Sequence, residues 1–145
     1  MKIVRKEAFE IAGIQVEAEF DDLHSEIPKA WKRLGKQLEE IPHRVGDVMT
    51  EISMGVKDGM YTELVGVEVD GNGTLPEEMV TARIPVQTYI HHRHQGPLEE
   101  IATTFGKILE WAEEKDYDTV DFKIDHGYLR DGSESEHDLY VKIEE

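Results

Sequence analysis

A single carboxylate stands among apolar side chains in the segment from Tyr61 to Val69. Alternate residues of an extended strand point to the same face, so Glu63 shares a face with Val65 and Val67. Burial raises the pKa of a carboxyl group, and such an acid serves as a counter-ion for a cationic ligand or as a general acid or base. We therefore predict that Glu63 faces a ligand pocket. The alternative is a strand-end glutamate that pairs with a lysine or reaches solvent.

Large aromatic side chains are the second kind of candidate, because a ring stacks on flat molecules and attracts cations. Trp31 lies on the apolar stripe of a segment with helical periodicity, whereas Tyr61, Tyr89 and Tyr128 lie on or near segments with strand periodicity. We predict that these four residues form walls of the same pocket. Ordinary packing in the core or in the sheet is the alternative for each of them.

Three histidines close together, His91, His92 and His94, are of a type that binds metal ions. On a strand, His92 and His94 would share a face, but no third ligand at a fixed spacing is evident. We therefore predict no metal site and no cofactor. His94 is expected instead to orient the start of the helix that follows it.

Several enzyme classes are excluded or lack support. The chain has no cysteine, which excludes disulfides, thiolate metal sites and a cysteine nucleophile. No serine lies in a Gly-x-Ser-x-Gly setting and no glycine-rich phosphate loop occurs, so acyl transfer and nucleotide binding lack support. No catalytic residue is assigned, and a binding role is preferred to an enzymatic one.

The charge of the chain limits its partners. Sixteen basic and thirty-two acidic residues give a net charge of −16, which repels phosphate backbones and anionic lipid surfaces. We therefore predict no direct contact with nucleic acid or membrane. No apolar run approaches the roughly 20 residues that span a bilayer, and charged residues interrupt the start of the chain where a signal peptide would be apolar. A soluble, cytoplasmic protein is expected.

The hydrophobic periodicity predicts a strand and then a helix at the start of the chain. The strand covers residues 3–20, with a bend or bulge at Gly13. The helix is entered near Ser25 and Pro28 and ends near Pro42. A hairpin follows, because Asp-Gly between two alternating segments is a strong turn signal.

The second half of the chain repeats this order of elements. A strand interrupted by a proline leads to a helix that Gly-Pro opens, and two further strands follow. The predicted elements after the first helix are strands 48–56 and 61–69, strand 80–90, helix 97–116, and strands around 120–124 and 139–143.

The two halves, about 1–70 and 79–145, therefore share one order of elements in what we expect to be a single domain, 1–145. The predicted fold is α+β: duplicated β-α-β-β units form one antiparallel sheet with two helices on one face and a central ligand groove. Grooves between repeats are common binding sites.

The sequence resembles the GyrI-like small-molecule-binding domains, which are also the effector-binding modules of AraC-type and MerR-type transcription regulators. The resemblance covers nearly the whole chain. Its most telling part is the step from His94 through Gly96-Pro97 into a helix that carries Trp111. The other matching segments are 4–13, 27–31, 61–67, 84–89, 116–117 and 138–141.

The resemblance implies a concave centre with aromatic walls that binds amphipathic, often cationic or aromatic, molecules. It also implies a buried glutamate in a Glu-x-Tyr pair on the strand after the second helix, but Lys123 and Asp125 occupy those positions here. A lysine there disfavours a cation and favours an acidic or neutral ligand. The candidate ligand contacts are Trp31, Tyr61, Glu63, Tyr89, Lys123 and Tyr128.

We therefore expect a stand-alone protein that binds a small organic molecule for sensing or sequestration, with a role in transcription regulation. One alternative is a small hydrolase that opens reactive strained-ring compounds, with Glu63 or Glu51 activating water; a second acid in the pocket would favour it. Another is an acidic protein-interaction or inhibitor module. A protein partner or a homodimer is left open.

Overall fold

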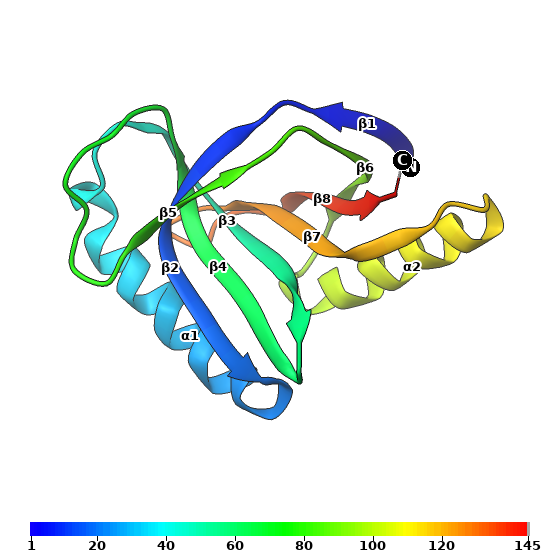
Figure 1. Cartoon of the computed structure of the whole chain (residues 1–145), viewed down its shortest axis with the longest axis horizontal. Helices are drawn as coiled ribbons and strands as arrows, with labels where there is room; N and C mark the ends of the chain where they lie inside the picture. The colour runs from blue at the N-terminus through cyan, green and yellow to red at the C-terminus, as the bar shows by residue number, and fades with distance from the viewer. Residues whose placement is uncertain (145) are drawn as a thin grey trace.

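The computed structural model describes residues 1–144, which form eight strands and two α-helices (Figure 1). A short 3-10 turn follows α1 and another precedes α2. The elements of the first half are β1 (Lys2–Lys6), β2 (Phe9–Glu19), α1 (Phe20–Gln37), β3 (Arg44–Lys57) and β4 (Met60–Val69). Those of the second half are β5 (Val80–Ile84), β6 (Gln87–Gln95), α2 (Ile101–Glu114), β7 (Thr119–Tyr128) and β8 (Glu136–Ile143).

The strands join in one antiparallel sheet in the order β1-β6-β8-β7-β3-β4-β2-β5. Each half contributes three neighbouring strands, and the halves meet where β3 pairs with β7. The hairpin between β3 and β4 turns at Asp58 and Gly59, both of which have positive φ angles. The predicted α+β fold, with duplicated β-α-β-β units in one antiparallel sheet, is confirmed.

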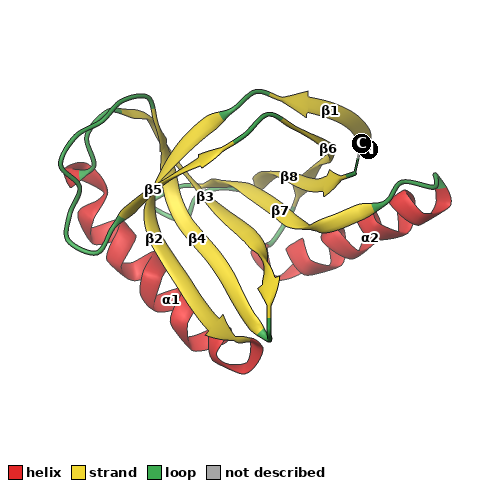
Figure 2. Cartoon of the chain, viewed as in Figure 1, coloured by secondary structure: helices red, strands yellow, loops and turns green. Residues whose placement is uncertain are grey.

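Both helices lie on one face of the sheet (Figure 2). Residues paired directly across strands share a face, and one such row runs through Ile14, Val65, Glu51, Asp125 and Leu139. Helix α1 packs over the end of the row that contains Ile14 and Val65, and α2 packs over the end that contains Leu139. The middle of the row, on β3 and β7, lies between the two helices.

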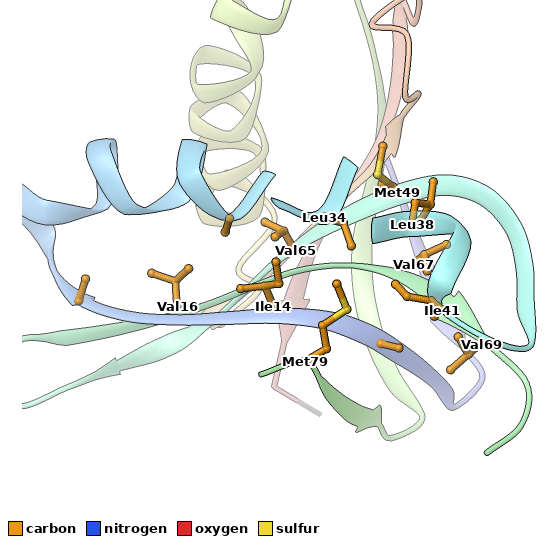
Figure 3. Packing of buried hydrophobic residues seen from close by; sticks show 13 residues of the cluster. Ile14, Val16, Leu34, Leu38, Ile41, Met49, Val65, Val67, Val69 and Met79 are labelled. Atoms are coloured by element: carbon orange, nitrogen blue, oxygen red, sulfur yellow. The ribbon is translucent and has the colours of Figure 1, made fainter. Parts of the chain in front are cut away.

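The core under α1 contains side chains from the helix, from β2 and from β4. Figure 3 shows Leu34 of the helix beside Ile14 and Val65 of the sheet, and all three are at least nine-tenths buried. Burying each such side chain contributes roughly 1.5–3 kcal/mol before conformational entropy is subtracted. This apolar contact holds α1 on its own half of the sheet.

One strand of each half pairs with a strand of the other half: β1 pairs with β6, and β5 pairs with β2. Lys2 of β1 pairs with His91, and Gly13 of β2 pairs with Val80, in a single register that is interrupted only where Pro85 separates β5 from β6. Since β2 also pairs with β4 and β6 with β8, β5 and β1 form the two edges of the eight-stranded sheet. Figure 1 shows β1 and β6 arching over the side away from the helices.

A second set of buried side chains fills the space under this arch. It includes Ile52, Leu64, Tyr89 and Ile124, which are at most 1% exposed. On the face away from the helices, apolar residues cover the central strands. On the helix face, apolar residues are concentrated under the two helices at the flanks.

The first helix begins at Phe20 rather than near Ser25, so the predicted start is wrong. Leu23 extends the apolar stripe by one turn and packs on the core under α1. Pro28 lies inside the helix instead of at its start, and it cannot donate the backbone hydrogen bond that an interior residue makes to the carbonyl four residues earlier.

The bulge that the sequence suggested at Gly13 is absent, because β2 and β4 keep a regular register there with Gly13 opposite Gly66. The two backbones approach closely at this point. A Cβ atom on Gly13 would overlap the carbonyl oxygen of Val65, and one on Gly66 would lie 2.5 Å from the carbonyl oxygen of Ala12. The paired glycines are therefore required by the closeness of the two strands.

We expect Gly13→Ala to destabilise the protein by about 3 kcal/mol or more, because a new methyl group would collide with backbone that cannot move aside. Urea unfolding followed by circular dichroism measures this. Gly35→Ala in α1, where a Cβ has no neighbour within 4 Å, is the matched control and should stabilise by up to about 1 kcal/mol. Equal effects of the two substitutions would contradict the close approach.

Candidate ligand-binding site

A groove runs along the helix face of the sheet between α1 and α2, at the junction of β3 and β7. On the α1 side it forms a cavity of about 340 Å³ beside Phe20 and Glu63, and on the α2 side one of about 410 Å³ beside Phe105. Ser53 and Lys123 line both cavities, so the two are parts of one groove. The predicted central groove is therefore present.

The strand register explains why the floor of this groove is polar. One row of paired residues runs Val16, Glu63, Ser53, Lys123, Val141 across five strands. Its apolar ends lie beneath the helices and its polar middle lies between them. The adjacent row has the same arrangement, with two acids in the middle and apolar residues at both ends.

Two glutamates of the floor each accept a hydrogen bond from a neighbour. The indole N–H of Trp31 donates to Glu51 over 2.9 Å, and the Ser53 hydroxyl donates to Glu63 over 2.8 Å. Glu63 is 7% exposed, and burial raises its pKa to about 7 against the opposing effect of the Ser53 hydrogen bond. Burial also raises the pKa of Glu51. Glu63 therefore changes its charge near neutral pH.

A third acid, Asp125, lies at the centre of a buried hydrogen-bond chain. The Tyr128 hydroxyl donates to one carboxylate oxygen, and His137 Nδ1 lies 2.8 Å from the other. Burial raises the pKa of Asp125 although both partners oppose the rise. Burial and the charge of Asp125 also raise the pKa of Tyr128, so its hydroxyl keeps its proton and remains a donor.

A bulge in β7 brings Tyr128 to the groove. Strict alternation after Asp125 would turn Tyr128 to the opposite face, but the register with β3 shifts at this point, so that Tyr128 pairs with Met49 of the helix face. Gly127 has a φ angle of +144° here, and a Cβ on it would lie 2.7 Å from the carbonyl oxygen of Glu136. The Tyr128 ring consequently packs against Trp31, with the ring centroids 4.5 Å apart.

The structure brings five of the six predicted contacts together around the groove. Tyr61, Glu63 and Lys123 line its cavities, while Trp31 and Tyr128 pack together above Glu51 and Asp125 through the hydrogen bonds described above. Whether these residues touch a ligand stays a prediction.

Tyr89 does not lie in the groove. Its side chain is fully buried on the opposite face of the sheet, in the cluster under the arch, where its hydroxyl accepts a hydrogen bond of 2.6 Å from Gln87. Successive side chains of a strand point to opposite faces of the sheet. Because the next residue of β6, Ile90, points to α2, Tyr89 points away from α2.

Several groove residues were not among the predicted contacts. Glu51 entered only as an alternative acid, and Asp125 only as a position that departs from the family pattern. Alternation along 51–55 could have revealed Ser53 beside Glu51, whereas Phe20, Phe105 and His137 come from elements whose packing no local pattern specifies.

Two of the three clustered histidines contact different groups in the structure. His91 pairs with Asp138 over 2.9 Å. His94 lies beside the start of α2, 2.8 Å from the Thr104 hydroxyl and 3.0 Å from the carbonyl oxygen of Pro97, as expected of a residue that orients the helix. Within residues 1–144, no three His, Cys, Asp or Glu side chains are grouped as metal ligands.

Solved structures of other proteins share this fold. The protein SAV2435, solved bound to tetraphenylphosphonium, superposes with a TM-score of 0.76 at 10% identity over 99% of this chain and 93% of that one. An integron cassette protein from the mobile metagenome of Vibrio cholerae superposes with a TM-score of 0.68 at 12% identity over 99% and 95%. At these identities the likeness concerns the fold.

The sequence identifies the family. Residues 2–143 match the family Cass2, described as integron-associated effector binding protein. The chain belongs to this family, and the predicted GyrI-like, effector-binding character is confirmed. The transcriptional regulator BrlR of Pseudomonas aeruginosa is 29% identical over 112 residues. That match covers 74% of this chain but 39% of the regulator, so the chain spans well under half of the length of this relative.

None of the helices in residues 1–144 is both long enough and apolar enough to cross a lipid bilayer.

The raised pKa of Glu63 predicts a pH-dependent cost to stability. The folded protein holds this proton up to pH about 7, whereas the unfolded chain releases it near the ordinary value of 4.5, so stability falls as the pH rises through this interval. Glu63→Gln removes the cost. We expect the variant to gain about 1–3 kcal/mol relative to the wild type between pH 5 and pH 8 in urea unfolding.

The control for this experiment is Glu17→Gln, which changes an exposed acid on the neighbouring strand. It makes the same chemical change at an exposed position and so controls for the loss of one negative charge. If the free energies of unfolding of the wild type and of Glu63→Gln change with pH in parallel, the raised pKa of Glu63 is contradicted.

Proposed function

We propose that the groove binds one amphipathic aromatic molecule that carries a positive charge, and that the protein acts by sensing or sequestering it. The observation that carries this proposal is the set of three acids, half-buried Glu51 and buried Glu63 and Asp125, on the floor of a groove with aromatic walls. Carboxylates and ring faces both attract organic cations.

The electrostatics of the groove agree with such a role. Burial is the main reason that Glu63 stays partly protonated at neutral pH, and the nearby charge of Glu51 adds to the effect. A bound cation would favour the ionised forms and so release protons. The acids are thus unstable in the charged state until a ligand supplies the opposite charge, and this gives binding a strong electrostatic component.

Three similar proteins support the proposal. SAV2435 was solved with tetraphenylphosphonium, a lipophilic aromatic cation. BrlR is a transcriptional regulator, and the domain of EcmrR that shares this fold with a TM-score of 0.70 at 14% identity belongs to a protein solved in complex with DNA and RPo. A role of the bound ligand in transcription regulation is therefore part of the proposal.

Tetraphenylphosphonium should bind and quench the fluorescence of Trp31, which forms a wall of the groove. We expect Glu51→Gln and Glu63→Gln each to weaken binding about ten-fold or more, because each removes one counter-charge from a desolvated site. Titration at pH 8, where Glu63 is ionised, gives the cleanest comparison. Glu17→Gln is the control and should bind like the wild type; equal affinities for all four proteins would reject a carboxylate-based site.

Hydrolysis of a strained-ring compound is the second candidate, because the groove contains the second acid that this activity needs. Glu63, with a pKa of about 7, suits a general base. In such a reaction water adds to a ring carbon while the ring C–O bond breaks, and the released oxygen takes up a proton.

Styrene oxide, an aromatic epoxide, distinguishes the two candidates. If the protein only binds, we expect chromatography to show diol at the rate of the buffer alone. Multiple turnovers that disappear in Glu63→Gln but persist in Glu17→Gln would instead establish the hydrolase and demote the sensing role.

A further inference from the structure

His137 is a histidine near the start of β8 whose side chain is buried in the core. The residue is 1% exposed. Alternation along β8 places it on the same face as Leu139 and Val141, which belong to the apolar cluster under α2. Its partner across the neighbouring strand β6 is His94, and the two ring centroids are 6.4 Å apart. A ring enclosed in this way has its contacts fixed by the fold.

Two of these contacts link His137 to the floor of the groove. Its Nδ1 lies 2.8 Å from one carboxylate oxygen of Asp125, while the Tyr128 hydroxyl donates to the other oxygen. The rings of His137 and Tyr128 also meet edge to face, with their centroids 4.6 Å apart. Each of the three side chains therefore contacts the other two. Asp125 and Tyr128 both line the cavity on the α2 side, so this buried histidine supports residues that border the groove.

The second ring nitrogen of His137 indicates where the hydrogen of the ring lies. Nε2 is buried and has no hydrogen-bond partner within residues 1–144. A neutral imidazole has one N–H and one lone pair. With the hydrogen on Nδ1, the N–H donates to Asp125; with the hydrogen on Nε2, a buried N–H would stay unpaired, which is unfavourable. The imidazolium form would leave the same N–H unpaired. The surroundings therefore favour a neutral ring with its hydrogen on Nδ1.

A donor at this position affects both the charge and the orientation of Asp125. Burial raises the pKa of Asp125, and the hydrogen bonds from Tyr128 and His137 both oppose the rise. Without His137, one carboxylate oxygen would lose its donor, and the acid would turn away or take up a proton to avoid a buried unpaired charge. Two donors on two fixed rings instead hold the carboxylate in one orientation.

We propose that His137 is a positioning residue: its Nδ1–H holds the Asp125 carboxylate ionised and in one orientation, so that Asp125 is a preformed counter-charge for the ligand on the α2 side of the groove. This inference rests on the proposed binding of an organic cation. It adds to that site a residue that acts through Asp125, since the ring of His137 is itself buried in the core.

The position of the hydrogen can be measured in the wild-type protein. Long-range proton–nitrogen NMR spectra distinguish the two neutral forms of an imidazole ring and the imidazolium by the shifts of the two ring nitrogens. The signals that disappear in His137→Asn identify His137. At pH 7 we expect a neutral ring with its hydrogen on Nδ1. A hydrogen on Nε2, or on both nitrogens, would overturn the inference.

Substitutions of His137 test its effect on binding. The probe is tetraphenylphosphonium, whose charge does not depend on pH, and calorimetric titration at pH 7 gives its affinity. His137→Leu occupies the same apolar space without a donor and should weaken binding about ten-fold. His137→Asn keeps an N–H near the position of Nδ1 and should bind within about three-fold of the wild type. Melting temperatures show whether both variants fold.

A double-mutant cycle separates positioning of Asp125 from general damage to the groove. Asp125→Asn removes the charge that His137 is proposed to hold. Adding His137→Leu to this variant should therefore weaken binding by less than about two-fold. A further ten-fold loss in the double variant would show that His137 acts on another part of the site, and the inference would be wrong.

The outcomes separate this inference from the function on which it rests. If tetraphenylphosphonium binds the wild type and Glu63→Gln weakens it, but folded His137→Leu binds like the wild type, the cation site stands and the role of His137 is wrong. If folded His137→Asn binds as weakly as His137→Leu, a donor at this position is not the cause. If tetraphenylphosphonium does not bind the wild type, both proposals fail. The nitrogen shifts of the wild type test the inference even where a variant does not fold.

Discussion

Each helix packs on the strands of its own half, and the pairing of β3 with β7 joins the halves at the place that neither helix covers. Helix α1 is held by the apolar side chains of β2 and β4, and α2 by those of β6 and β8. The two central strands therefore have a helix on either side but none above them. The strand register determines which residues meet at this place: it aligns Glu51 with Asp125 and Ser53 with Lys123 across the junction. The groove follows from the way in which the two units are joined, and its polarity from which residues meet there.

A polar floor in this position lowers stability, and the local hydrogen bonds limit the loss. Each of the three acids has at least one donor: Trp31 for Glu51, Ser53 for Glu63, and Tyr128 for Asp125. These bonds orient the carboxylates but do not overcome burial, which is why the pKa values of all three acids are raised. A core of apolar residues would be more stable at the same positions. Three acids between aromatic rings lower the stability of the fold, and such losses of stability are found at functional sites, where a bound ligand supplies the compensating charge.

Hydrophobic periodicity was enough to predict both helices, the order of strands and helices and the face of Glu63, because each of these depends on neighbours within one strand or helix. The segments predicted as single strands, 3–20 and 80–90, are each divided into two strands. The hairpin at Asp58-Gly59 is similarly local. Tyr89 was misplaced because the partner exchange of the outer strands encloses a second apolar cluster, so apolar residues line both faces of β6 and parity alone does not say which face holds the groove. The position of Tyr128 depends on a bulge at Gly127, where the register between β7 and β3 shifts. Such features arise from contacts between segments that are far apart in the chain.

The departure from the usual family pattern at Lys123 and Asp125 also changes meaning once the strands are placed. Considered along β7 alone, a lysine in place of the acid suggests that the site has lost its affinity for cations. Across the sheet, however, negative charge is supplied by three strands: Glu63 from β4, Glu51 from β3 and Asp125 from β7. Lysine therefore does not replace the acidic site but adds a charge of the other sign beside it.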